Sequence, residues 1–298
     1  MTKRILLFLA TNLLVILTLS VVLRVLGIQP YLTRQGIDYT SLAAFCLVWG
    51  MGGALISLAL SRIIAKTAMG VKVIDPATSD PVAQQLLQTV GHLVRGAGIP
   101  MPQVGIYQSE DINAFATGPT KNRSLVAVST GLLRKLGNDE VEGVLGHEIT
   151  HIANGDMVTM TLLQGVVNAF VMFLARVIAF ALAQAMRRDD NEGMSFGLYF
   201  VVQIALEMVF MVLGSLVVMA FSRHREFRAD AGGAHLAGRE KMVSALEALR
   251  RDVENLDPRA QPAVASMKIS GRGGLFGRLG ASHPPLEERI ARLRAVAV

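Results

Sequence analysis

Apolar residues fall into four long runs that are separated by polar segments. The runs cover approximately residues 5–26, 41–60, 158–183 and 196–221. Each is at least as long as the 20 or so residues that an α-helix needs to cross a bilayer, so we expect four transmembrane helices. The first run is longer than the apolar part of a secretion signal, which has about 7–15 residues, and no small-residue cleavage site follows it. We therefore expect it to remain as an uncleaved anchor.

Two further stretches, 65–157 and 222–298, have the patterns of a folded domain. Short β-prone segments bounded by Gly, Pro or polar residues predict strands at 71–74, 103–107, 113–117 and 125–129. Helical patterns occur at 80–97, 139–153, 223–249 and 285–296. We expect Asn138 to cap the second of these helices, and the pair Gly232-Gly233 to break the third. The glycine-rich stretch 266–282 is expected to form a mobile loop, and it is a candidate gate.

The order of these segments predicts one α+β domain that is divided in sequence by a transmembrane hairpin. Residues 1–64 are expected to form an N-terminal transmembrane pair, and residues 158–221 the hairpin. Residues 65–157 and 222–298 are then the first and second parts of the domain. Together the two parts are long enough for a single domain with its own core.

Composition and charge support a membrane protein. Of 298 residues, 52% are hydrophobic and only 17% are charged, whereas soluble domains carry about 25% charged residues. Most Lys and Arg lie outside loops 27–40 and 184–195, which hold only Arg34, Arg187 and Arg188. Basic residues remain on the cytoplasmic side, so both termini and the divided domain are expected there. The net charge of +6 therefore indicates topology, and no nucleic-acid partner is expected.

The stretch His147-Glu148-Ile149-Thr150-His151 carries candidate metal chemistry. Residues four apart share a helical face, so both imidazoles can bind one ion with Glu148 beside them. Zinc accepts neutral imidazole and carboxylate, and it lowers the pKa of a bound water, whose proton an adjacent carboxylate can take. The alternative is an ordinary helix that happens to carry histidines. The chain has one cysteine, Cys46, so a cysteine zinc cluster is excluded.

A catalytic zinc site needs a third ligand, and candidates follow the fourth apolar run. Glu226 and Asp230 are also four residues apart, and they can share a face that meets the histidine pair. The runs before them form a hairpin, so the histidine helix and this helix lie at the same membrane surface. The alternative is a solvated pair of carboxylates on a basic helix. His224 is a rival ligand, but it points away from Glu226 around the helix.

These residues belong to motifs that occur together in a known family. The motifs are Gly146–His151, Arg225–Asp230, Asn113–Gly118 and Ser282–Ile290. Over nearly the whole chain they resemble the HtpX family, bacterial inner-membrane zinc endopeptidases related to the CAAX prenyl proteases. The resemblance implies that His147, His151 and Glu226 bind one zinc ion per chain, and that Glu148 is the general base. It also implies that Asp230 orients a zinc histidine.

Two further assignments come from the same motifs. The first assignment is a resemblance to the family's edge strand beside the cleft, carried by Asn113, Ala114, Phe115 and Ala116. An extended peptide can bind to such a strand through backbone hydrogen bonds. The alternative is that these residues form a core strand. His283 either donates a hydrogen bond to the oxyanion of the reaction or caps the loop before the final helix.

Two ionisable residues lie within apolar runs, namely Arg176 and Glu207. Intramembrane charges are costly and usually paired. We expect an ion pair between them that joins the hairpin, with a water-filled cavity as the alternative.

The expected fold is an α-helical membrane protein with four transmembrane helices and an α+β, zincin-like cytoplasmic metalloprotease domain. Its expected function is zinc-dependent cleavage of misfolded or damaged membrane proteins on the cytoplasmic side of the bacterial inner membrane, in protein quality control and stress response. Self-cleavage is compatible with this function. The alternatives are a CAAX-type prenyl-peptide protease, which usually has more spans, and a non-catalytic scaffold in which zinc joins the two halves. A scaffold would not need Glu148.

Overall fold

The computed structural model describes residues 2–28, 31–33, 36–186, 195–255 and 283–295. Contacts divide the chain into two compact units. The first comprises Met1–Ser57 and Met160–Val218, and the second Leu58–Thr159 and Met219–Val298. The expected gate at 266–282 lies outside the described residues. The division of the chain into functional domains stays a prediction.

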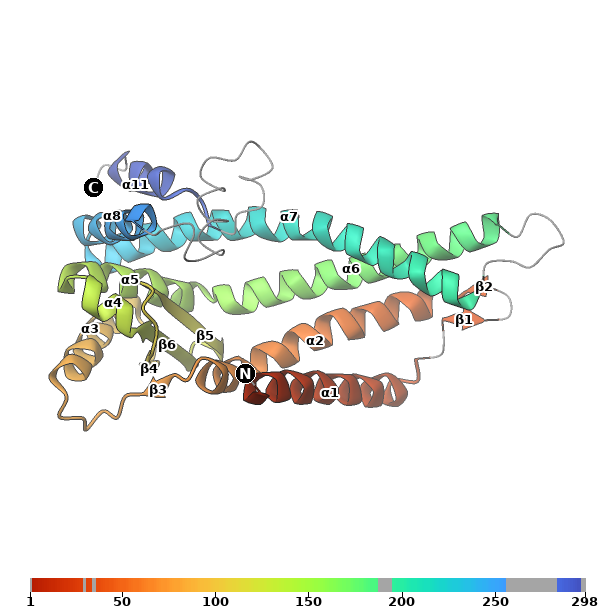
Figure 1. The fold of residues 1–298 in the computed structure, drawn as a ribbon, viewed down its shortest axis with the longest axis horizontal. Helices are drawn as coiled ribbons and strands as arrows, with labels where there is room; N and C mark the ends of the chain where they lie inside the picture. Colours follow the sequence, from red (N-terminus) through yellow and green to blue (C-terminus); the bar gives the residue numbers. More distant parts are fainter. Residues whose placement is uncertain (1, 29–30, 34–35, 187–194, 256–282, 296–298) are drawn as a thin grey trace. The chain divides into compact units, whose positions relative to one another are not determined.

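Long helices account for most of the first unit (Figure 1). They are α1 (Thr2–Val25), α2 (Tyr39–Ala68), α6 (Asp156–Ala185) and α7 (Phe196–Ala237). Within the described residues, three helices are long and apolar enough to cross a membrane, namely Tyr39–Ala68, Asp156–Ala185 and Gly197–Ala237. The described apolar part of α1, Leu13–Val25, is shorter. The fourth span therefore still rests on the sequence.

Small residues allow the helices of this unit to approach closely. A Cβ atom added at Gly50 of α2 would lie 2.6 Å from the backbone nitrogen of Ala169 on α6. One added at Gly214 of α7 would lie 2.7 Å from Val167 on α6. Interfaces between membrane helices are rich in small residues for this reason. A short hairpin that the sequence did not predict, β1 (Leu32–Thr33) with β2 (Gly36–Ile37), precedes α2.

The expected intramembrane ion pair is confirmed. Arg176 Nη1 on α6 lies 2.5 Å from Glu207 Oε1 on α7, and it also donates to the carbonyl oxygen of Met172 at 3.0 Å. Gln203 donates to the same carboxylate oxygen at 3.2 Å. The guanidinium carbon of Arg176 also lies 5.6 Å from the ring centroid of Phe45. This cation–π contact connects α6 with α2.

Breaking this ion pair is expected to destabilise the first unit. Removing one partner leaves a charge without its counter-ion, so Arg176→Gln and Glu207→Gln should each cost about 3 kcal/mol of stability. The double variant should lose less than the sum of the two. Thermal unfolding in detergent measures this, with Arg24→Gln, the same change at an exposed arginine of α1, as the control. Unchanged melting temperatures for both single variants would exclude a structural role for the pair.

The second unit contains a four-stranded sheet in the order β3-β4-β6-β5. Its strands are β3 (Lys72–Val73), β4 (Gln103–Tyr107), β5 (Ala114–Thr120) and β6 (Arg123–Ser129). Strands β4 and β6 are parallel, whereas β3 and β5 are antiparallel to their neighbours. All four lie where the sequence predicts strands. Strand β5 is an edge strand, as expected.

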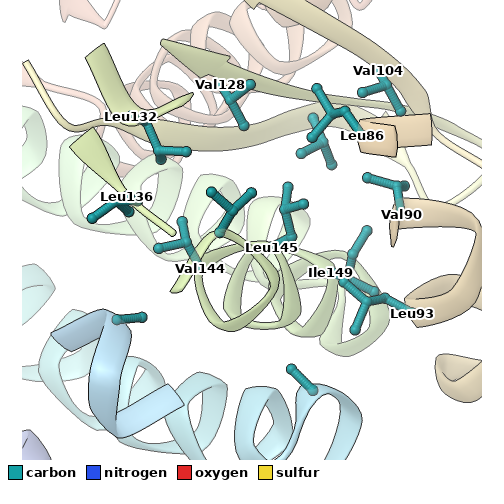
Figure 2. Close-up of a cluster of buried hydrophobic side chains, with 14 of the residues drawn as sticks. Leu86, Val90, Leu93, Val104, Val128, Leu132, Leu136, Val144, Leu145 and Ile149 are labelled. Atoms are coloured by element: carbon teal, nitrogen blue, oxygen red, sulfur yellow. The ribbon is translucent and has the colours of Figure 1, made fainter. Parts of the chain in front are cut away.

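Helices cover one face of this sheet. They include α3 (Pro81–Ala97), α4 (Thr130–Lys135) and α5 (Asn138–Asn154), with α8 (Arg239–Asn255) against α5 and α11 (Leu286–Ala295) against α8. Figure 2 shows the core between α3, α5 and the sheet, where Leu145 and Ile149 of α5 point toward Val128 of β6 and Leu93 of α3. Every labelled side chain there is buried. This packing fixes α5, which carries the histidine pair.

Two local predictions were wrong. The N-cap of α5 is Gly137, and Asn138 is the first helical residue; the Gly137 backbone amide donates to Glu140 Oε2 at 3.0 Å. Helix α7 continues through Gly232-Gly233 and ends at Ala237, because the break lies at Gly238, whose φ is 102°. The glycine pair instead allows close packing. A Cβ atom at Gly232 would lie 2.8 Å from Thr150 Oγ1 on α5.

Candidate metal centre

Two helices position the candidate ligands. The histidines lie on the side of α5 that faces α7, and both are buried. Gly233 allows this approach, since a Cβ atom there would lie 3.0 Å from the His147 backbone nitrogen. Glu226, three α-helical turns before the end of α7, is 0% exposed. A carboxylate is costly to bury unless positive charge or hydrogen bonds compensate, so this position calls for a cation or protonated groups.

The ligand atoms of His147, His151 and Glu226 converge. The two Nε2 atoms are 3.0 Å apart. His147 Nε2 lies 3.4 Å from Glu226 Oε2, and His151 Nε2 lies 3.4 Å from Glu226 Oε1. Zinc bonds to nitrogen and oxygen of about 2.0–2.1 Å in a tetrahedron separate the ligand atoms by roughly 3.3 Å. The donor types and their spacing therefore fit a zinc ion, and these three residues form a group that could hold a metal.

The outer nitrogens of both imidazoles face carboxylates. His147 Nδ1 lies 3.0 Å from Asp230 Oδ1, four residues beyond Glu226 on α7. His151 Nδ1 lies 2.7 Å from Asp156 Oδ2, at the first residue of α6. An imidazole that binds a metal through Nε2 carries its proton on Nδ1, which can then donate to such a carboxylate. The expected partner Asp230 and the unforeseen partner Asp156 therefore both orient Nε2 toward the common centre.

A turn between α5 and α6 explains the position of Asp156. Helix α5 ends at Asn154, and Gly155 follows in a left-handed conformation with φ 69°. The Gly155 backbone amide donates to the carbonyl oxygens of His151 and Ile152, which ends α5, and α6 then begins at Asp156 beside the last turn that carries His151. The sequence signal is the Gly155-Asp156 pair, which the prediction did not use.

Arg289 is a second residue that sequence reasoning did not assign. It lies on α11, and it is only 6% exposed. Its Nε donates to Asp230 Oδ2 at 2.7 Å and its Nη2 to Asp230 Oδ1 at 2.5 Å. Its Nη1 lies 3.8 Å from Glu226 Oε2. The Ser282–Ile290 motif contains Arg289, but spacing alone does not connect it with α7.

The carboxylates also affect the pKa values of the histidines. Burial lowers the pKa of His147, but hydrogen bonds to Asp230 and Glu226 outweigh this effect and raise it above its usual value. Burial likewise lowers the pKa of His151, but Asp156 and Glu226 raise it to about 9. Without a cation the neighbouring carboxylates therefore favour the protonated form of these imidazoles. A metal that binds through Nε2 displaces protons, so its affinity should fall as the pH falls.

A cavity of about 130 Å³ adjoins the ligands. Its lining includes Glu148, His147, Glu226 and residues of the strand at the sheet edge. Glu148 is half-buried, and no hydrogen bond or ion pair to it occurs within the described part of the chain. Its carboxylate is therefore free to contact a water molecule or substrate in this cavity.

The sheet edge also contributes to this cavity. Asn113 and Ala114 line it. The backbone N–H of Asn113 donates to Ser129 Oγ at 3.1 Å, and this hydrogen bond holds the residue before β5 in place. Phe115 points to the opposite face of the sheet, where its ring centroid lies 5.7 Å from that of Tyr107. Ala116 packs against the main core. Of the four residues expected at this edge, two therefore reach the cavity.

His283 lies at the rim of the cavity. Its side chain is 59% exposed, and Nδ1 is 2.8 Å from Glu226 Oε2. It is thus close to the candidate ligands, but its role as an oxyanion donor or a loop cap stays a prediction. His224, the rival ligand, is exposed and is not part of the converging group.

The chain is similar to proteins of a known peptidase family. Residues 81–297 match Peptidase family M48. Similar proteins include a Protease HtpX homolog of Thiobacillus denitrificans, 52% identical over 99% of both chains. Another, from Bacillus subtilis, is 50% identical over 99% of this chain and 100% of that protein.

A solved structure has a similar fold. The crystal structure of S. mikatae Ste24p aligns with 98% of this chain at a TM-score of 0.64 and 18% identity. The chain spans 64% of the length of that protein. The family match and the extent of identity to the HtpX proteins together show that this chain belongs to Peptidase family M48, among the HtpX proteases, and is a membrane metalloprotease.

Proposed function

We propose that this metalloprotease is a zinc-dependent endopeptidase that cleaves unfolded or damaged membrane proteins at the cytoplasmic face of the bacterial inner membrane. His147, His151 and Glu226 hold one zinc ion per chain, and Glu148 is the general base. The observation that carries the proposal is the convergence of three ligand atoms within 4.8 Å, beside a cavity lined by a free carboxylate. A purely structural zinc site has no use for that carboxylate.

Each side chain has a chemical task in this proposal. Bound zinc supplies a Lewis acid that acidifies water and polarises a peptide carbonyl. Glu148 accepts a proton from the attacking water and then delivers it to the nitrogen of the leaving amine. Asp230 and Asp156 accept hydrogen bonds from the Nδ1–H groups of the two histidines and keep Nε2 free for the metal.

The sheet edge, the apolar helices and the distribution of charge support the proposed substrate and location. Strand β5 has one edge that pairs with β6 and a second edge without a partner strand in the described sheet. An extended peptide can add to such an edge through backbone hydrogen bonds, which requires an unfolded segment and reads little side-chain identity. Within the described residues, three helices are long and apolar enough to cross a membrane, and membrane insertion would bring the protease close to membrane substrates. The scarcity of Lys and Arg in loops 27–40 and 184–195 favours a cytoplasmic site.

Metal removal tests the proposal. The purified full chain in detergent should contain about one zinc ion per chain and cleave an unfolded membrane protein. Chelation should abolish cleavage, and one equivalent of Zn²⁺ should restore it, because the proposed reaction has no other Lewis acid. A folded soluble protein serves as the control substrate.

The same assay distinguishes the alternatives. Preferred cleavage of a prenylated peptide would support a CAAX-type protease. Stoichiometric zinc without cleavage of any substrate, the chain itself included, would support a zinc-joined scaffold. Cleavage that survives complete removal of the metal would overturn the zinc mechanism.

A further inference from the structure

We propose that Arg289 is a positioning residue for the metal site, through which the helix α11 sets the orientation of His147. This inference rests on the proposed function of the same site. Arg289 does not offer a ligand atom to the metal, since a guanidinium remains protonated and has no lone pair to donate. It acts instead through Asp230, whose two carboxylate oxygens it holds at once.

The orientation of the Asp230 carboxylate decides whether His147 is held in place. Its Oδ1 must face His147 Nδ1, at 3.0 Å, for the imidazole to present Nε2 to the metal. A lone carboxylate on a helix can rotate about its side-chain torsions and lose this contact. Arg289 removes that freedom, because Nε binds Oδ2 and Nη2 binds Oδ1 in a fork that fixes the carboxylate plane.

Arg289 also compensates charge in a crowded region. The buried carboxylates of Glu226, Asp230 and Asp156 surround two histidines, and Glu148 lines the adjoining cavity. A bound zinc ion supplies only two positive charges. Two guanidinium groups supply further positive charge in the same region: Arg289 Nη1 lies 3.8 Å from Glu226 Oε2, and Arg225 Nη2 lies 3.4 Å from Glu226 Oε1. This charge is most effective where solvent does not screen it, and Arg289 is buried.

The attachment of α11 does not depend on Arg289 alone. Ile290 and Leu293 are buried against Met242 and Leu246 of α8. The guanidinium carbon of Arg292 lies 3.7 Å from the ring centroid of Phe227, and Arg294 Nη2 lies 2.5 Å from Glu247 Oε1. These contacts should keep α11 in place when the Arg289 side chain is changed. The variants below therefore test positioning, separately from docking of the helix.

Three variants of the full chain in detergent test the inference. Arg289→Lys keeps the charge but loses the fork, because an ammonium is a point charge and cannot hold both oxygens in one plane. Arg289→Met loses both. Arg294→Met removes an exposed ion pair from the same helix and is the matched control. Zn²⁺ affinity is measured by competition with a chromophoric chelator, and the visible spectrum of the Co²⁺-loaded protein reports the ligand geometry.

We expect Arg289→Lys to weaken Zn²⁺ binding about tenfold and Arg289→Met about a hundredfold, the range found for partners of zinc ligands. The Co²⁺ spectrum should change in both, and Arg294→Met should match the wild type. Wild-type affinity and spectrum in Arg289→Lys would overturn the inference, and so would equal losses in Arg294→Met. Thermal unfolding of the metal-free proteins is recorded alongside, because a lower melting temperature with unchanged affinity would show a structural role only. If the wild type itself bound no Zn²⁺, the proposed function would fail instead.

Discussion

Replacing Glu148 by glutamine is expected to leave zinc bound while reducing proteolysis by about 10²–10⁴-fold, the usual contribution of general acid–base catalysis. The amide is nearly the same size as the carboxylate but cannot accept the proton of the attacking water. Because Glu148 is not among the converging ligand atoms, metal content should not change. Zinc content and cleavage of an unfolded substrate are measured on the same preparations.

Glu142→Gln is the matched control for this variant. Glu142 lies on the same helix, but its Oε2 pairs with Lys241 Nζ at 2.7 Å, away from the cavity. We expect it to cleave at the wild-type rate within a factor of about two, because a partly exposed ion pair contributes under 1 kcal/mol. Full activity in Glu148→Gln would show that another group is the base. Loss of zinc in Glu148→Gln would instead place Glu148 among the ligands.

Replacing Glu226 by glutamine is expected to remove the metal itself. Binding energies of zinc sites with four protein ligands are about 10–16 kcal/mol, so losing one anionic ligand should cost roughly 3 kcal/mol, or more than a hundredfold in affinity. Cleavage should be lost in proportion to metal occupancy and recover at high Zn²⁺ concentration. Elemental analysis after dialysis, together with the Zn²⁺ dependence of cleavage, measures both effects.

The outcome for Glu226 also distinguishes a ligand from a neighbour. Glu247→Gln, on α8 and paired with Arg294, is the control and should keep its zinc. If Glu226→Gln retained wild-type zinc affinity, the third ligand would have to be sought elsewhere, and His283 at 2.8 Å from Glu226 would be the first candidate.

Much of the fold was predictable because its signals are local. The four strands of the larger sheet and helix α3 have short-range sequence patterns. Asp80, a residue type favoured at the N-cap, caps α3 by accepting a hydrogen bond from the Val82 backbone N–H at 3.0 Å. The histidine pair was found because two ligands four residues apart lie on one helical turn. Glu226 and Asp230 were found by the same spacing on α7.

Asp156 was missed although its signal is local, whereas Arg289 and the role of the glycine pair depend on tertiary contacts. Arg289 contacts Asp230, which is 59 residues away in the sequence, and no periodic sequence pattern predicts a contact over that separation. Gly232 and Gly233 were misread because glycine lowers helix propensity locally, whereas here the missing side chains let α7 approach Thr150 and His147. Packing outweighed propensity at that point.

The distribution of the site along the chain has a consequence for its biosynthesis. His151 is translated 75 residues before Glu226 and 138 residues before Arg289, with two membrane helices in between. At about 5–20 residues per second, the histidine helix exists for several seconds without its third ligand. Until Glu226 is translated, the nascent chain therefore lacks the third of the proposed ligands and cannot complete the proposed metal site.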